Sequence, residues 1–274
     1  MREFAPLSFA WLRIAGAALI LSFVVRDAEP LSAKDKRLVS GFAVLAVVLN
    51  ATLFLVGLSL TSVQVAAVLI TTIPVFTLAT AILTGRERAS ANRILGIALA
   101  GAGALLVVGG ESLAGTRASF LGALLIVLNC LSYAIYLVIS KPHMARLSAR
   151  SVVARMFLVG AVLMLPVSAY SLLHERWTRI PPNAWLTLAV VILGPTVAAY
   201  LLQAWALRHA ESSVVAAYTY VQPVLAAILG AMFLGEHIRP IVAVAAAMIF
   251  AGVWLAGGKT GRAPDQQYGG GSHP

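Results

Sequence analysis

The side chains that could carry chemistry are few in this sequence, and they form no catalytic or metal-binding pattern. The five His residues lack the spacing of metal ligands, and no combination of Ser, His and Asp typical of a hydrolase is evident. The single cysteine, Cys130, lies inside an apolar run, which excludes a disulfide framework and a thiolate metal site. The sequence therefore predicts no enzymatic activity, no metal and no cofactor.

The charged residues argue against a proton relay inside a membrane. All ten acidic residues lie in polar connections, at the termini or at the ends of apolar runs, whereas proton relays usually need a carboxylate at mid-membrane. Arg13 is the one ionic residue well inside an apolar run. A charge in hydrocarbon is costly, so Arg13 is a candidate ionic contact for a substrate carboxylate; stabilisation of the helix bundle, or a side chain that reaches the membrane surface, is the alternative.

Polar and aromatic side chains collect in four apolar runs, where they could line a solute cavity. Sites for small organic solutes are mostly apolar and aromatic with a few polar groups, and this set has that chemistry. Interfacial aromatic rings and hydrogen bonds between helices would explain each residue individually, so both interpretations stay open. The candidate cavity residues are Asn50, Thr71, Thr72, Pro74, Tyr200, Gln203, Trp205, Tyr218, Tyr220, Gln222 and Pro223.

The elements that position these residues are predicted to be membrane-spanning helices. Of the 274 residues, 60% are apolar and only 11% are charged, which leaves little surface for water. A spanning helix needs about 20 apolar residues. On this criterion the sequence predicts an all-α polytopic bundle of about nine spans in the lipid bilayer, namely 5–25, 38–60, 62–84, 94–110, 118–140, 152–173, 184–207, 213–234 and 240–257.

The basic residues predict the orientation of the chain. The net charge of +10 comes mainly from Lys and Arg between apolar runs, which is typical of topology signals, so nucleic-acid binding is not expected. Fourteen Lys and Arg residues lie on one side of the predicted membrane and five on the other. Positive residues favour the cytoplasm, which predicts a cytoplasmic C-terminus and, for an odd number of spans, an N-terminus outside. The polar tail 259–274 is expected to be disordered.

An internal repeat relates the two halves of the chain. Shifting the sequence by 149 positions matches Pro74 with Pro223 at mid-span and Glu87 with Glu236 at the span's end. The matched spans are an odd number of spans apart, so the two copies are expected to cross the membrane in opposite directions. Inverted repeats are typical of transporters whose halves rock around a site near the midplane.

Three stretches resemble the EamA-like branch of the drug/metabolite transporter superfamily. The family's repeat has a Pro in one helix, a Glu at its end and a Gly-rich following helix, as in LFLVGLSLTSVQVAAVLITTIPVFTLATAILTGRERASANRILGIALAGAGALLVVGG at 53–110. The second copy contains YVQPVLAAILGAMFLGEHI. The stretch FLGALLIVLNCLSYAIYLVISK at 120–141 is similar to the helix that opens the family's second half. The resemblance covers nearly the whole chain.

The resemblance implies ten helices around a central cavity through which small solutes are exported. Segment 5–19 is similar to the family's second helix, so we expect an inverted five-helix repeat without its first helix: four spans in 1–117 and five in 118–258, before the tail 259–274. The expected function is export of small metabolites such as amino acids across the inner (plasma) membrane by alternating access. A membrane scaffold or assembly subunit is the alternative, and the sequence defines neither the solute nor the oligomeric state.

Overall fold

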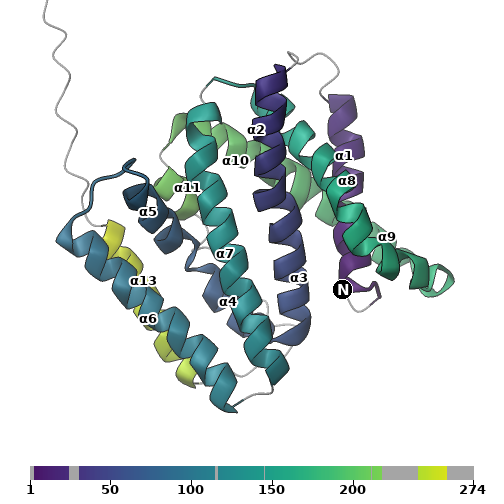
Figure 1. Cartoon of the computed structure of the whole chain (residues 1–274). Helices are drawn as coiled ribbons and strands as arrows, with labels where there is room; N and C mark the ends of the chain where they lie inside the picture. The colour runs from purple at the N-terminus through teal and green to yellow at the C-terminus, as the bar shows by residue number, and fades with distance from the viewer. Residues whose placement is uncertain are drawn as a thin grey trace, which may run out of the picture.

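The chain is a bundle of helices long enough to cross a membrane several times (Figure 1). The computed structural model describes residues 3–24, 31–114, 117–144, 146–210, 212–217 and 240–257. Six helical segments within these ranges are long and apolar enough to span a bilayer: Pro6–Phe23, Ala33–Leu60, Val65–Leu83, Arg117–Met144, Ala149–His174 and Pro182–His209. The shorter apolar helices are Ala91–Leu106 and Ala243–Gly252. The prediction of an all-α, multi-pass fold is confirmed, whereas predicted span 213–234 lies largely outside the described residues.

All regular elements of the described ranges are helices. They are α1 (Pro6–Val24), α2 (Ala33–Ala43), α3 (Asn50–Leu60), α4 (Val63–Ile70), α5 (Ile73–Leu83), α6 (Ala91–Ala114), α7 (Arg117–Met144), α8 (Ala149–His174), α9 (Pro182–Val191), α10 (Ala199–His209), α11 (Ser212–Ala217) and α13 (Pro240–Gly257). The π-helical stretches η1 (Val44–Leu49) and η3 (Ile192–Ala198) join α2 to α3 and α9 to α10, and the 3-10 turn η2 (Trp177–Arg179) precedes α9. The backbone stays in the right-handed helical region at both π-helical junctions, so each joined unit is one long helix.

The two π-helical stretches have different local causes. In η3, the ring of Pro195 would clash with the carbonyl group of Val191 in a regular α-helix, and the wider turn relieves this contact. The hydroxyl of Thr196 then donates to the Val191 carbonyl oxygen at 2.8 Å. The stretch η1 contains neither Pro nor Gly. Its carbonyl groups instead accept hydrogen bonds from neighbouring helices, so the cause of this widening is tertiary.

The predicted kink at Pro74 is a break between α4 and α5. Thr71 and Thr72 form the turn between the two helices, and their hydroxyls donate to the carbonyl oxygens of Val68 at 2.5 Å and Leu69 at 2.7 Å. Pro74 follows in the first turn of α5, where the N–H group that proline lacks would have no helical partner. The carbonyl oxygens at the end of α4 thus accept both the backbone N–H groups and the hydroxyls of the turn.

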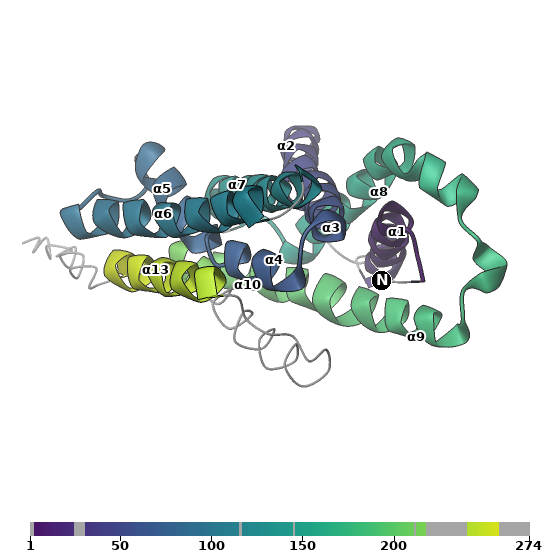
Figure 2. The same cartoon turned by 90° about the horizontal axis from the view of Figure 1, so that it is seen from below.

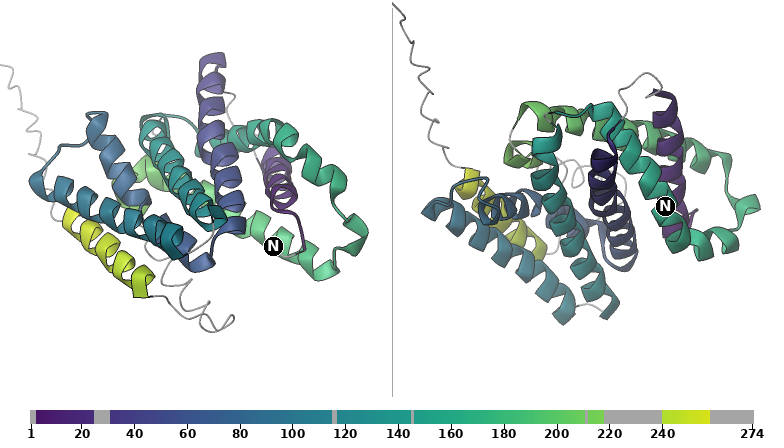
Figure 3. Two further views of the ribbon diagram at one scale, coloured as in Figure 1. Left: turned by 60° about the horizontal axis from the view of Figure 1, so that its bottom comes forward. Right: turned by 45° about the horizontal axis from the view of Figure 1, so that its top comes forward.

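The helix α7 lies in the middle of the bundle, between the pair α1 and α8 and the pair α6 and α13 (Figures 2 and 3). It packs closely against α3 through two glycines: a Cβ atom on Gly57 would lie 2.9 Å from the Gly122 carbonyl oxygen, and one on Gly122 would lie 2.8 Å from the Gly57 oxygen. In the neighbouring pair of α1 and α8, the indole of Trp11 on α1 donates to the Ala161 carbonyl oxygen on α8 at 3.1 Å. Small residues and interhelical hydrogen bonds are the usual means of helix association in lipid.

The helices α6 and α13 lie side by side and run in opposite directions (Figures 1 and 2). A Cβ atom on Gly103 would lie 2.9 Å from the carbonyl oxygen of Ala245. Further along the pair, a Cβ atom on Gly252 would lie 2.5 Å from the Gly96 oxygen and 2.6 Å from the Ala100 nitrogen. The two backbones are therefore as close as glycine allows.

We expect Gly252→Ala to destabilise the protein by about 1–3 kcal/mol, because the new methyl group would push against main-chain atoms of α6 that cannot rotate away. The matched control is Gly101→Ala on α6, where no atom lies within 4 Å of the new Cβ, and which should be neutral or stabilising by up to about 1 kcal/mol. Thermal unfolding of the purified variants in detergent measures both effects. Equal stability of the two variants would contradict the close packing of α6 and α13.

Candidate functional site

A polar cluster lies where α10 meets α7 and the π-helical turn η1. The hydroxyl of Tyr133 on α7 donates to Oε1 of Gln203 on α10 at 2.6 Å. One turn before Gln203, the hydroxyl of Tyr200 donates to the Ala46 carbonyl oxygen in η1 at 2.6 Å. The ring of Tyr200 also meets that of Phe157 edge to face, with 4.9 Å between centroids. The cluster thus joins α7, α8, α10 and η1 by polar and aromatic contacts.

A row of polar side chains on α7 faces the same π-helical turn. The hydroxyl of Ser132 donates to the Leu45 carbonyl oxygen at 2.9 Å, and the amide of Asn129 donates to the Asn50 carbonyl oxygen at 2.8 Å. Both side chains are almost completely buried. Asn50, a candidate cavity residue, is therefore held in place through its main chain. The α7 row supplies hydrogen bonds that hydrocarbon could not supply.

Arg13 on α1 lies within electrostatic reach of Tyr200. Its Nε atom is buried and makes no hydrogen bond to any described residue. A guanidinium group has five N–H donors and no means of losing its charge in the protein. The polar cluster therefore has a cationic group within electrostatic range of Tyr200, with an Nε–H donor that is not used by a described residue.

The other candidate cavity residues are placed apart from this cluster or outside the described residues. Thr71, Thr72 and Pro74 are buried and form the break between α4 and α5. The ring of Trp205 is 59% exposed and packs on His209, with 4.6 Å between centroids. The remaining four candidates, Tyr218, Tyr220, Gln222 and Pro223, lie outside the described residues.

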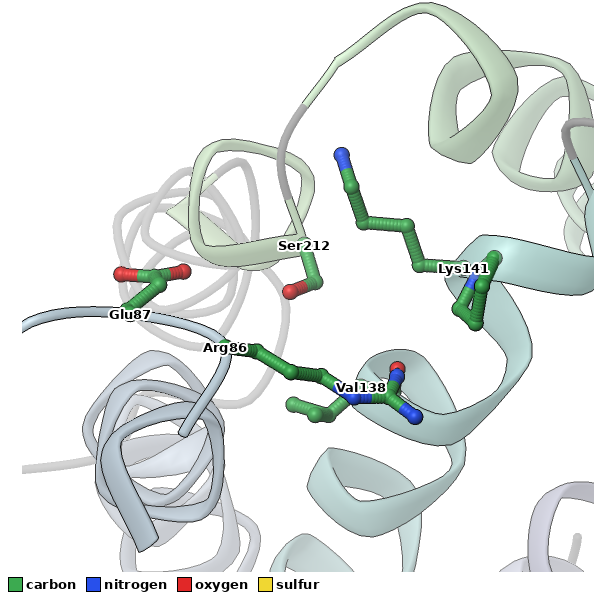
Figure 4. Close-up of a pocket in the computed structure, with 6 residues that line it drawn as sticks. Arg86, Glu87, Val138, Lys141 and Ser212 are labelled. Carbon is green, nitrogen blue, oxygen red and sulfur yellow. The ribbon is translucent and has the colours of Figure 1, made fainter. Parts of the chain in front are cut away.

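A pocket of about 360 Å³ lies at one end of the bundle, where α5, α7 and α11 meet (Figure 4). The Arg86 guanidinium, on the connection after α5, donates to the Val138 carbonyl oxygen of α7. Lys141 extends from α7 and donates to the Ala210 carbonyl oxygen at 2.6 Å. The pocket is lined by Arg86, Glu87, Val138, Lys141, Pro142 and Ser212.

Neither site has the composition of a metal centre. Among the described residues, no three His, Cys, Asp or Glu side chains lie close enough together to hold a metal ion. What both sites offer is hydrogen-bond donors and positive charge within a largely apolar bundle. Such a lining can bind a small polar solute.

Comparison with known proteins places this arrangement in a family. Residues 1–109 and 120–258 match the family described as "EamA-like transporter family". The chain belongs to the EamA-like transporters. Both matched segments contain a π-helical turn, and the family resemblance inferred from the sequence is confirmed.

Individual relatives of this EamA-like protein carry names of the same kind. A protein of Archaeoglobus fulgidus (strain ATCC 49558 / DSM 4304 / JCM 9628 / NBRC 100126 / VC-16) named "Uncharacterized transporter" is 25% identical over 94% of this chain and 90% of its own. The "Uncharacterized inner membrane transporter YedA" of Escherichia coli (strain K12) is 28% identical over 71% of this chain and 62% of its own. A solved structure titled "Crystal structure of protein" has a TM-score of 0.64 at 18% identity, over 93% of this chain and 88% of that one, and shares the fold.

These comparisons and the apolar helices establish a multi-pass membrane transporter. The family consists of transporters rather than enzymes.

Sequence reasoning missed several residues that the EamA-like fold brings together. Asn129, Ser132, Tyr133 and Tyr136 recur at spacings of three, one and three residues on α7, which places them on one helical face. This polar row on an otherwise apolar helix was the available signal. Arg86, Lys141 and Ser212 left no such signal, because they come from three distant segments.

We expect the hydrogen bond between Tyr133 and Gln203 to appear as an energetic coupling. Tyr133→Phe leaves the partly buried amide oxygen of Gln203 without its donor and should cost about 1 kcal/mol of stability. The double variant Y133F/Q203L removes both partners, so its cost should fall below the sum of the two single costs. Thermal unfolding of the four proteins in detergent gives the coupling, and strictly additive costs would contradict it.

Proposed function

We propose that this EamA-like protein exports small organic metabolites, such as amino acids, across the inner membrane by alternating access. In this proposal the first half, 1–117, and the second half, 118–258, are inverted copies of one helical unit. The polar cluster around Tyr200 forms part of the solute site between them. The observation that carries the proposal is that each half contains a widened helix at the same place in its repeat.

The helix bounds follow the offset of the sequence repeat. The long helix 33–60 and the long helix 182–209 are separated by 149 residues at both ends, and the same offset takes η1 to 193–198, within η3. Because η1 and η3 have different local causes, their shared position supports a common architecture.

The contact between α6 and α13 supports the inverted relation. An offset of 149 takes Gly103 to Gly252 and Gly96 to Ala245. The contact of Gly103 with Ala245 thus has its equivalent in the contact of Gly252 with Gly96. A pair of antiparallel helices that exchange equivalent contacts has a local two-fold axis, as expected for copies that cross the bilayer in opposite directions.

Each residue of the cluster has a role in the proposed cycle. Tyr133, Tyr200 and Gln203 would exchange their present hydrogen bonds for bonds to polar groups of the solute, and Arg13 would contact a solute carboxylate. Helices with widened turns can bend where hydrogen bonding is already interrupted. Rocking of the two halves about η1 and η3 would then open the site to either membrane face in turn.

The same proposal includes about nine spans, an N-terminus outside and a cytoplasmic C-terminus. Reporter fusions test this orientation. Green fluorescent protein fused after residue 258 should fluoresce, while alkaline phosphatase at the same place should be inactive. Phosphatase inserted beside Arg179 in η2 should be active, because that connection is proposed to lie outside. The reverse pattern would contradict the orientation.

Efflux measurements test transport and the site together. We expect cells that express the chain to release at least one of a panel of labelled metabolites faster than cells without it. Tyr200→Phe and Gln203→Leu should each slow this efflux about tenfold, equivalent to the loss of one hydrogen bond of about 1.4 kcal/mol. The matched control is Trp205→Phe on the same helix, whose exposed ring lies apart from the cluster and whose replacement should have no effect.

Efflux must be compared at equal amounts of each variant in the membrane, since the cluster also stabilises the bundle. Normal efflux through both cluster variants would exclude the proposed site. No efflux of any metabolite through the unaltered chain would favour the membrane scaffold.

A further inference from the structure

The pocket at the end of the bundle contains cationic groups that the proposed cycle does not use. Arg86 lies three residues after α5 ends at Leu83, Lys141 lies in the last turn of α7, and Ser212 begins α11. The side chains of Arg86 and Lys141 line the same pocket from two different elements, the Arg86 guanidinium on the side of Val138 and the Lys141 ammonium on the side of Ala210 (Figure 4). These elements end together, so the pocket lies where the bundle would meet a membrane surface.

The two cations of the pocket are not neutralised by any described carboxylate. Each donates to a main-chain carbonyl group, Arg86 to Val138 and Lys141 to Ala210. The Glu87 carboxylate, which also lines the pocket, forms an ion pair with Arg93 at 3.3 Å. The described part of the pocket therefore has an excess of positive charge. Glu211, the residue before Ser212, lies outside the described residues.

These side chains retain hydrogen-bond donors for a ligand. A guanidinium group has five N–H donors and an ammonium group has three. Arg86 and Lys141 each use one donor in a described hydrogen bond to a main-chain carbonyl oxygen. Ser212, which lines the pocket from α11, is 4% exposed, and its hydroxyl can add a further donor. Planar guanidinium groups bind carboxylate and phosphate oxygens in pairs.

We infer that this pocket binds an oxyanion, a phosphate or carboxylate group held by Arg86 and Lys141. Two sources have this chemistry: the headgroup of an anionic phospholipid and a free anionic solute. Basic pockets between helices at a membrane surface suit anionic headgroups. Leu83, the last residue of α5, lies three residues before Arg86, is 87% exposed and would offer an apolar surface for an acyl chain.

Thermal unfolding of the purified full chain in a neutral detergent tests the site. Four probes are added separately: phosphatidylglycerol, phosphatidylcholine, inorganic phosphate and acetate. A ligand that binds only the folded state and is present at a concentration of about ten times its Kd should raise the Tm by about 3 °C. Phosphatidylcholine is the control for lipid in general, since its headgroup has no net charge.

The test variant is R86Q/K141Q, which removes both cations. Its control is R88Q/R150Q, which removes the same amount of positive charge. Arg88, after α5, and Arg150, at the start of α8, are exposed and do not line the pocket. We expect the oxyanion shift to persist in the control and to be lost in the test variant. Since Arg86 also holds α7, Lys141→Gln alone provides a second variant, in which the shift should fall by at least half.

The pattern of shifts identifies the source of the oxyanion. A shift with phosphatidylglycerol alone assigns the pocket to a lipid headgroup, and a shift with phosphate or acetate assigns it to a soluble anion. No shift with any of the anionic probes would overturn the inference, and so would an equal shift in wild type, R86Q/K141Q and Lys141→Gln. Because the measurement is of binding, its outcome is independent of whether the chain transports a solute.

Discussion

The constraint on which this structure depends is that hydrocarbon offers no hydrogen bonds to a peptide group. A regular helix meets this constraint by itself, but a widened or broken helix does not. In η1 the carbonyl groups of Leu45 and Ala46 accept hydrogen bonds from Ser132 and Tyr200, which come from two other helices. In the break before α5, Thr71 and Thr72 supply hydroxyl donors from within the turn, and Cys130 of α7 adds a thiol donor. Each interruption described here thus has at least one side-chain donor bonded to its carbonyl groups.

This constraint also explains where polar residues occur in the bundle. The same row on α7 that satisfies η1 includes Tyr133, which bonds to Gln203. A polar group required by one helix thus brings further polar groups into the centre of the molecule. Around them, close glycine contacts such as Gly57 with Gly122 hold the helices together. Such packing is needed because apolar side chains gain no hydrophobic free energy when they move from lipid into a helix interface. The polar interior and the tight packing are two responses to the same solvent.

Much of the fold could be predicted from the sequence, since the length and hydropathy of each apolar run are local properties. The position of Pro74 indicated a break, and Arg13, the ionic outlier of the sequence, lies within electrostatic range of Tyr200. The turn η1 could not be predicted, because its sequence VLAVVL contains no helix breaker and its widening depends on partners from α7 and α10. The pocket was equally hidden. Arg86 and Lys141 looked like topology signals, and only the pocket that both line suggests a ligand.

The pairing of α6 with α13 has a consequence for how this chain can change over generations. In a homodimer, one substitution alters both sides of the interface at once. Here the proposed copies are joined in one chain, so each side can vary separately, and Gly96 already differs from its counterpart Ala245 by one methyl group. The backbones come closest where Gly252 faces Gly96, the side on which both residues are glycines. An exchange of the two helices would place an alanine on that close side, so the two helices are not interchangeable there.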